Sequence, residues 1–193
     1  MLPSSQNPIA ISHPKQQPSH TMHFTSLISA LFLTLVALTS GSVAQTVTYR
    51  GYSSTVQCSG SNFFCSDGGG VCCGPMPAGF GFSAGFENLP NGSQGQGYTD
   101  NCRSFLFAVF GSGTRCWNGG GARANFLNWF HSAGRIQARD ATEAKECTAP
   151  NGFSYKDGAG AERVIKVAAG EGEVIAEHFK SQNWTALAAY ESA

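Results

Sequence analysis

Few side chains in this sequence have the chemistry of a catalyst. Beyond residue 44 the histidines are His131 and His178, and we interpret each as packed within the fold rather than as a base. The carboxylates Asp67, Glu87 and Asp100 could supply an acid/base pair for glycoside hydrolysis, but their spacing places no two of them together. The sequence contains no His-Glu-x-x-His motif and no phosphate-binding Gly-Lys loop. We therefore assign no catalytic residue, and we expect no metal site and no cofactor.

The best candidate for ligand binding is Arg115, Trp117 and Asn118, just before the glycines at 119–121. A tryptophan at the edge of a loop, with a guanidinium and an amide beside it, suits a small molecule or a carbohydrate. The alternative is that Trp117 covers a disulfide.

Seven cysteines indicate a chain stabilised by disulfides. The adjacent pair Cys72-Cys73 normally joins two separate partners, and the Cys-x-x-Cys spacing of a zinc site is missing. Six cysteines are disulfide candidates, and they lie within residues 58–116: Cys58, Cys65, Cys72, Cys73, Cys102 and Cys116. Because seven is odd and Cys147 stands apart, we predict that Cys147 is unpaired or links two chains in a dimer.

The order of the first six cysteines resembles that of inhibitor cystine-knot proteins. Six residues separate Cys58 from Cys65 and six separate Cys65 from Cys72, whereas the gaps to Cys102 and Cys116 are longer than in those scaffolds. In composition and layout the chain resembles the small secreted cysteine-rich proteins of filamentous fungi. The resemblance implies export and a disulfide-stapled fold.

The N-terminus has the pattern of a secretory signal. Residues 24–39 are apolar or hydroxylated without a charge, and Ser42-Val43-Ala44 fits the cleavage rule. We predict a signal peptide over 22–44, an over-extended N-terminus over 1–21, and a secreted, extracellular domain over 45–193. The apolar stretch is too short for a stable membrane span.

The composition excludes nucleic acid as a partner. Lys and Arg number 12, as do Asp and Glu, so no strong positive field exists. Within the domain, residues 45–134 are rich in glycine and cysteine, whereas residues 135–193 are more polar. Asn91 and Asn183 lie in glycosylation sequons.

The apolar patterns predict an α+β, β-rich fold. Residues 80–86 alternate, with Phe80, Phe82 and Phe86 on one face that we expect to be core, and residues 104–110 read as a central buried strand. Residues 163–167 and 174–179 read as a hairpin, and Phe126, Trp129 and Phe130 have helical spacing. We expect a disulfide-stapled small single domain, a sheet or sandwich with one main helix near 122–133.

Three functions fit these features. The first is a non-enzymatic secreted protein, similar to an effector or toxin, that acts on an extracellular protein partner. The alternative is a module that binds carbohydrate, such as a cell-wall polysaccharide. The second alternative is a small secreted hydrolase.

Mass analysis of the secreted protein tests the export prediction. We expect a first residue of Gln45, three disulfides, and either one remaining thiol or a dimer linked through Cys147. Seven free thiols would contradict export.

Overall fold

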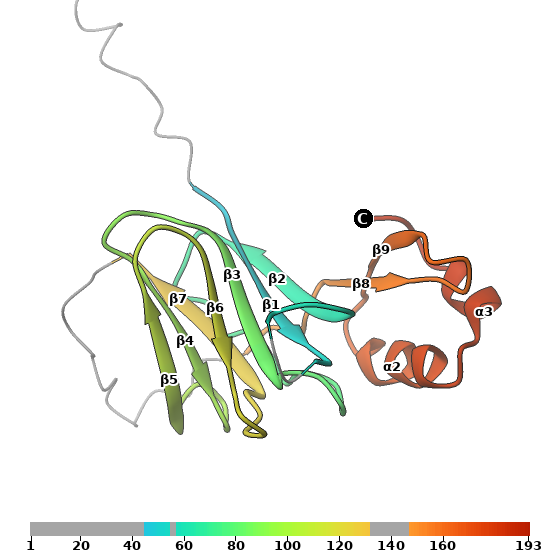
Figure 1. Ribbon diagram of the computed structural model, residues 1–193, viewed down its shortest axis with the longest axis horizontal. Coiled ribbons are helices and arrows are strands. Elements are labelled where there is room, and N and C mark those ends of the chain that lie inside the picture. The colour runs from blue at the N-terminus through green and yellow to red at the C-terminus, as the bar shows by residue number, and fades with distance from the viewer. Residues whose placement is uncertain (1–44, 55–56, 132–146) are drawn as a thin grey trace, which may run out of the picture. The chain divides into compact units, whose positions relative to one another are not determined.

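The computed structural model describes residues 45–54, 57–131 and 147–193, in which nine strands form two sheets and two helices follow (Figure 1). The strands are β1 (Val47–Tyr52), β2 (Asn62–Asp67), β3 (Ser83–Leu89), β4 (Gln94–Tyr98), β5 (Phe105–Phe110), β6 (Gly113–Asn118), β7 (Phe126–Phe130), β8 (Gly152–Lys156) and β9 (Glu162–Lys166). The helices are α2 (Gly172–Lys180) and α3 (Trp184–Ala188). The predictions for 1–21 and 22–44 lie outside the described residues.

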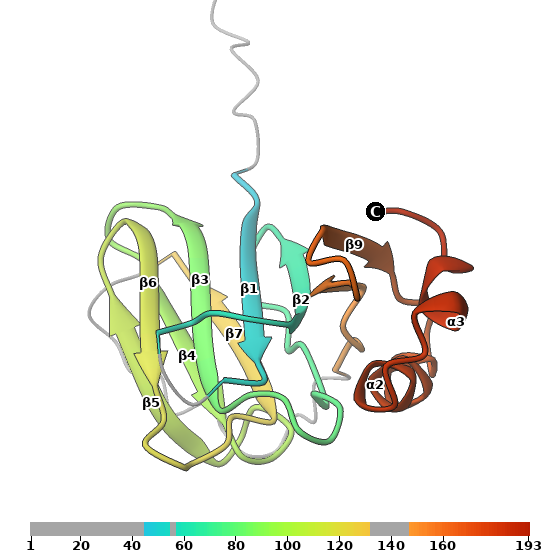
Figure 2. The same ribbon diagram turned by 45° about the vertical axis from the view of Figure 1, so that its right-hand side comes forward.

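The larger sheet has six strands in the order β6-β3-β1-β2-β8-β9, and the smaller has the order β5-β4-β7. All the paired strands in both sheets are antiparallel. Two views place the small sheet against the β3 and β6 side of the large sheet (Figure 1 and Figure 2). The prediction of a β-rich fold with disulfides is confirmed, and the helices are confined to the C-terminal part of the described chain.

Aromatic rings fill the space between the two sheets, and glycines on β4 make room for them. Gly95 faces the ring of Phe86, and Gly97 faces the ring of Phe107, so closely that a Cβ atom at either glycine would overlap the ring. The two rings also meet edge to face at 6.4 Å. Gly95 therefore lets Phe86 of the large sheet reach the β4 backbone, while Gly97 lets Phe107 of the neighbouring strand β5 lie over β4 within the small sheet.

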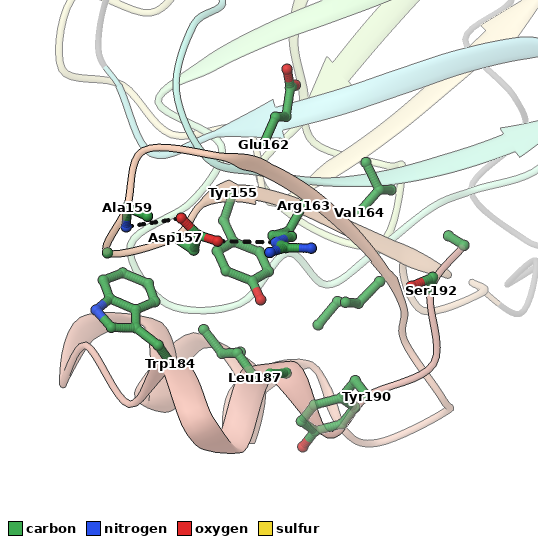
Figure 3. Close-up of a pocket in the computed structure, with 14 residues that line it drawn as sticks. Tyr155, Asp157, Ala159, Glu162, Arg163, Val164, Trp184, Leu187, Tyr190 and Ser192 are labelled. Carbon is green, nitrogen blue, oxygen red and sulfur yellow. Dashed lines mark hydrogen bonds and ion pairs between the residues drawn. The ribbon is translucent and has the colours of Figure 1, made fainter.

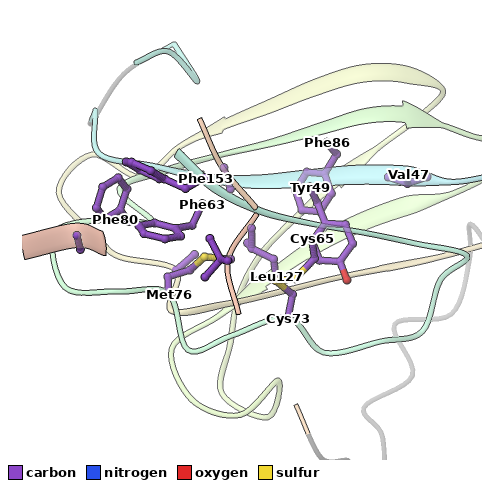
Figure 4. Close-up of a cluster of buried hydrophobic side chains, with 14 of the residues drawn as sticks. Val47, Tyr49, Phe63, Cys65, Cys73, Met76, Phe80, Phe86, Leu127 and Phe153 are labelled. Atoms are coloured by element: carbon purple, nitrogen blue, oxygen red, sulfur yellow. A yellow bond between two sulfur atoms is a disulfide. The ribbon is translucent and has the colours of Figure 1, made fainter. Parts of the chain in front are cut away.

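A second group of aromatic side chains joins the large sheet to the helices. Phe63 stacks on Phe153 at 4.4 Å, Phe80 meets Phe63 edge to face at 4.7 Å, and Phe179 of α2 contacts Phe153. Figure 4 shows Phe63, Phe80 and Phe153 grouped at one end of the core. The expectation of a core face is confirmed for Phe80 and Phe86, which are 1% and 0% exposed, but not for Phe82, which is only half-buried.

The alternating segment 80–86 begins as a turn rather than as a strand. Gly81 has a φ of 91°, and β3 begins only at Ser83. A Cβ atom on Gly81 would overlap the carbonyl of Ala124, so glycine is required there both for its backbone angle and for close packing.

The predicted helix near 122–133 is wrong, because residues 126–130 form strand β7. Phe126, Trp129 and Phe130 have helical spacing by coincidence: β7 is buried on both faces, so its apolar residues do not alternate. Pairing with β4, from Tyr98 opposite Phe126 to Gln94 opposite Phe130, decides the outcome. Residues 132 and 133 lie outside the described part.

The predicted central strand over 104–110 is also wrong, because β5 lies at the edge of the small sheet. Phe105 and Phe110 are 49% and 54% exposed, while Phe107 alone among the three phenylalanines of β5 is buried.

The predicted hairpin of 163–167 with 174–179 is replaced by a hairpin of β8 with β9, in which Phe153 lies opposite Ile165. Residues 172–180 form α2, which turns Ile175, Ala176 and Phe179 toward the core. The spacing of these three residues is typical of a helix, but the β-branched residues Val174 and Ile175 favoured the prediction of a strand.

The close packing of β4 is tested by a matched pair of glycine substitutions. Gly97→Ala should lower the free energy of unfolding by about 1–3 kcal/mol, because its methyl group would displace the Phe107 ring. Gly68→Ala is the control, because no atom lies within 4 Å of its Cβ position. Equal stabilities of the two variants in urea would contradict this packing.

Candidate functional site

The three residues predicted to bind a ligand together do not form one site. Trp117 stacks on Phe107 at 4.0 Å with the ring planes 7° apart, and Arg115 donates from Nε to the Phe110 carbonyl at 2.9 Å. Asn118 lies on the opposite face of β6, where its Oδ1 accepts from the Gln57 N–H. Arg115 and Trp117 therefore fasten β5 to β6.

The alternative role of Trp117, covering a disulfide, fails for the same geometric reason. Cys116 is the next residue on β6, and successive side chains of a strand point to opposite faces. Cys116 pairs with Cys58 on one face, while the Trp117 ring packs on Phe107 on the other.

Two of the three candidate acidic residues are occupied by structural contacts. Asp67 accepts hydrogen bonds from the Tyr49 hydroxyl, from Trp129 Nε1 at 2.9 Å and from the Gly69 N–H. Glu87 forms a bidentate ion pair with Arg50. Asp67 and Glu87 lie on the two strands that flank β1, and Asp100 lies in the turn after β4.

The two candidate histidines lie in different segments of the fold. His131 lies beside the Trp129 ring, and His178 lies in the last turn of α2. The run Gly81-Phe82-Ser83-Ala84-Gly85 has the spacing of a nucleophile elbow, but Ser83 is 0% exposed within β3 and donates to the Ser54 carbonyl. Ser83 is therefore not exposed as the nucleophile of such an elbow would be.

All seven cysteines lie in the described residues, and their arrangement corrects one prediction. Cys58 pairs with Cys116, and Cys65 pairs with Cys73. Cys147 does not stand apart: Cys72 is placed to form a disulfide either with Cys147 or with Cys102. A disulfide between Cys147 and Cys72 of the same chain is therefore an alternative to the expected dimer linked through Cys147.

A cavity of about 630 Å³ lies between the β8–β9 hairpin and α3 (Figure 3). Its size falls in the range of small-molecule sites. Tyr155 of β8 and Trp184 of α3 line it with parallel rings, 6.1 Å apart with planes 5° apart. Tyr155 is buried against Phe153, whereas Trp184 is half-buried. The cavity therefore combines a fixed ring on the sheet with a more accessible ring on the helix.

A turn and an ion pair hold the polar side of this cavity. Asp157 Oδ1 accepts from the N–H groups of Ala159 and Ala161, and Oδ2 accepts from Arg163 Nε at 3.0 Å. The bond from Arg163, helped by these backbone bonds, lowers the pKa of Asp157. Asp157 is therefore ionised at neutral pH, and it fixes the guanidinium of Arg163.

Two polar groups at the cavity keep hydrogen-bonding capacity. Arg163 uses only Nε toward Asp157, and its Nη groups meet no partner in the part of the chain that the structure describes. The Tyr155 hydroxyl likewise meets none there, and in Figure 3 it points into the cavity. Burial raises the pKa of Tyr155, so this hydroxyl is a neutral donor and acceptor.

Helix α3 places Trp184 because the preceding residue caps it. Asn183 Oδ1 accepts from the Ala186 N–H at 3.2 Å, and Leu187 is buried beneath the helix. Asn183 and Asn91 are both exposed, so both predicted glycosylation sites are open to solvent. From the sequence, this segment could be identified only as a glycosylation sequon. The cavity could not be predicted, because Arg163 and Trp184 are far apart in the sequence.

A second groove, of about 680 Å³, lies on the other side of the C-terminal segment and is lined by Phe64, Val167 and Ala168 among others. The charged side chains at this groove, Lys166 and Glu191, pair with each other. It thus offers fewer uncommitted polar groups than the first cavity.

The model of the ARB_05566_N family, described as an N-terminal domain, matches residues 48–151. The chain belongs to this family. No curated protein and no solved structure matches the chain. The ARB_05566_N match covers strands β1 to β7 and ends just before β8, so the cavity residues Tyr155, Arg163 and Trp184 lie outside it.

No helix in the described ranges is long and apolar enough to cross a membrane. The disulfides are consistent with an extracellular protein.

A substitution at Trp117 separates its structural role from ligand binding. Trp117→Ala should lower the free energy of unfolding by about 3 kcal/mol, because it removes the ring that packs on Phe107 between the sheets. Phe110→Ala is the control, since Phe110 is 54% exposed and its loss should change stability by about 0.5 kcal/mol or less. A fully stable Trp117→Ala protein would contradict the structural role.

Proposed function

We propose that the protein is a secreted, non-enzymatic binding protein that takes a neutral saccharide of a cell wall into the cavity between β8–β9 and α3. The observation that carries this proposal is that one cavity brings together an accessible tryptophan ring and an arginine, Arg163, that is held by Asp157 through Nε and keeps its Nη groups for a ligand. A target on an extracellular protein remains compatible with the proposal if that protein carries the saccharide.

The aromatic side of the cavity suits the apolar face of a sugar ring. Trp184 is half-buried, so part of its ring is open to a ligand, while Tyr155 is held by Phe153 and does not need the ligand for its position. An aromatic ring that is already ordered loses little conformational entropy when a sugar packs on it. Trp also carries a polar N–H beside its apolar face.

The polar side supplies hydrogen bonds without a net charge. Asp157 neutralises Arg163, and in Figure 3 the carboxylate of Glu162 points away from the cavity. The Arg163 Nη groups can donate to sugar hydroxyl oxygens, and the Tyr155 hydroxyl can both donate and accept. A neutral polyhydroxylated ligand matches this set better than an anion, which would have to compete with Asp157 for Arg163.

The lack of an acid/base pair supports binding rather than hydrolysis. Two side-chain carboxylates line the cavity: Asp157 is committed to Arg163 and to two backbone N–H groups, and the carboxylate of Glu162 points away in Figure 3. A glycosidase of the usual kind needs two carboxyl groups facing one glycosidic bond. Asp157 here instead organises one wall of the cavity.

Calorimetric titration with chitin and β-glucan oligosaccharides tests the proposal. We expect binding by the wild-type protein, and a loss of affinity of roughly tenfold or more, or about 1.4 kcal/mol, in Trp184→Ala and in Arg163→Gln. Tyr155→Phe keeps the packed ring and removes only the hydroxyl, so it should bind more weakly at unchanged thermal stability.

Matched controls remove the same kinds of side chain elsewhere. Phe110→Ala deletes an exposed aromatic ring, and Arg103→Gln removes an exposed guanidinium in the turn before β5; both should bind like the wild type. Failure of the wild type to bind any saccharide of the panel, or full affinity in Trp184→Ala, would contradict the proposal.

A further inference from the structure

Three sulfur atoms converge at one edge of the fold, where only one disulfide can form among them. The Sγ atoms of Cys72, Cys102 and Cys147 all lie within 4.8 Å of one another. Cys72 is placed for a bond with Cys102 and for a bond with Cys147. Since one sulfur atom forms one disulfide at a time, Cys102 and Cys147 share Cys72.

The backbone, rather than the disulfide, keeps Cys147 beside Cys72. Thr148, the next residue, donates its N–H to the Cys72 carbonyl at 2.8 Å, and its own carbonyl accepts from the Gly74 N–H at 2.8 Å. The Thr148 hydroxyl also donates to the Cys72 carbonyl. These bonds are independent of the sulfur chemistry, so Cys147 stays within reach of Cys72 when Cys72 bonds to Cys102.

The turn between β4 and β5 holds Cys102 in the same way. The Thr99 N–H donates to the Ser104 carbonyl at 2.9 Å across the base of this turn, and Asn125 Nδ2 donates to the Thr99 carbonyl at 3.0 Å. Within the turn Cys102 has a φ of 53°, in the left-handed region. The turn therefore presents Cys102 to Cys72 without help from the disulfide.

The three cysteines differ in access to solvent. Cys72 is 1% exposed and packs with Tyr98 and Phe126, whereas Cys102 and Cys147 are both half-buried. The shared sulfur is thus the shielded one, and the two that compete for it lie nearer to water. A thiolate formed at either outer position is more easily hydrated than one at Cys72.

We infer that Cys72, Cys102 and Cys147 form a thiol–disulfide exchange site that holds one disulfide and one reactive thiol. The thiolate of Cys147 attacks Cys72 Sγ, a Cys72–Cys147 bond forms, the Cys72–Cys102 bond breaks, and Cys102 leaves as a thiolate. The attacking thiol first gives its proton to water, and the departing thiolate takes one back. The reaction runs equally in reverse and needs no oxidant or reductant.

The same thiol is a modification site for a small extracellular disulfide. When a thiolate at Cys102 or Cys147 attacks a disulfide such as oxidised glutathione, it forms a mixed disulfide and releases one glutathione thiolate. In the described residues the Sγ atoms of the two other pairs, Cys58–Cys116 and Cys65–Cys73, are not part of a comparable cluster of three, although Cys73 follows Cys72 in the sequence. They should not exchange.

Thiol labelling of the unreduced, secreted protein followed by peptide mapping tests the site. With seven cysteines we expect one label per chain, divided between Cys102 and Cys147, and both the Cys72–Cys102 and Cys72–Cys147 cross-linked peptides in one preparation. Replacing any one of the three by Ser should reduce the label from one per chain to none, because an even number then remains within reach. Cys58→Ser, the control, should raise it to two by releasing Cys116.

Incubation with oxidised glutathione extends the test on the same protein. The wild type should gain one glutathione per chain at Cys102 or Cys147, and Cys147→Ser should gain none. Label or glutathione confined to a single position in the wild type would overturn the inference. So would a chain without label that runs as a disulfide-linked dimer, or three labelled thiols that retain added Zn²⁺. Because the mapping uses the wild type, a variant that fails to fold does not spoil the test.

Discussion

The fold depends on the close packing of aromatic rings against the backbone of β4, where the two sheets meet. Gly95 and Gly97 carry no side chain, so the ring of Phe86 from the large sheet and the ring of Phe107 from the neighbouring strand β5 lie directly against the β4 backbone. Trp117 then completes the contact by stacking on Phe107. Such close packing makes the dispersion energy large and leaves little tolerance for an added methyl group. Disulfides fasten the same region, since the Cys58–Cys116 bond joins the β1–β2 connection to β6.

The cavity inherits its rigidity from this core. Strand β8 pairs with β2 over Asn62–Phe64, and Phe153 at the centre of that pairing stacks on Phe63. Tyr155 follows two residues later on the same face, so its ring is fixed by the core rather than by a ligand. The hairpin turn and Asp157 then fix Arg163, and a cap fixes the start of α3. A site built in this way has paid most of its ordering cost before a ligand arrives.

The sequence allowed us to predict the disulfide-stapled, β-rich character of the chain, but not which residues contact one another. Cysteine number and phenylalanine content were enough to predict a disulfide-stapled β-rich core, with Phe80 and Phe86 inside it. The segment around Trp129 was misread because a strand buried on both faces has no alternation to distinguish it from a helix. Cys147 was predicted to stand apart because its proximity to Cys72 depends on the backbone hydrogen bond between Thr148 and Cys72, which connects residues far apart in the sequence. The cavity formed by Arg163 and Trp184 could not be predicted either, because strand register and the docking of α3 bring these two residues together.

The most direct test of the saccharide site uses the three tryptophans of the chain as reporters. In a two-dimensional ¹H–¹⁵N spectrum each indole N–H gives its own signal: Trp129 is fully buried, Trp117 is packed between the sheets, and Trp184 lines the cavity. On titration with a chitin or β-glucan oligosaccharide, we expect the Trp184 signal to shift with ligand concentration, with the Trp117 and Trp129 signals unchanged. A saccharide that binds while the Trp184 signal stays fixed, or that shifts the Trp117 signal instead, would contradict the account.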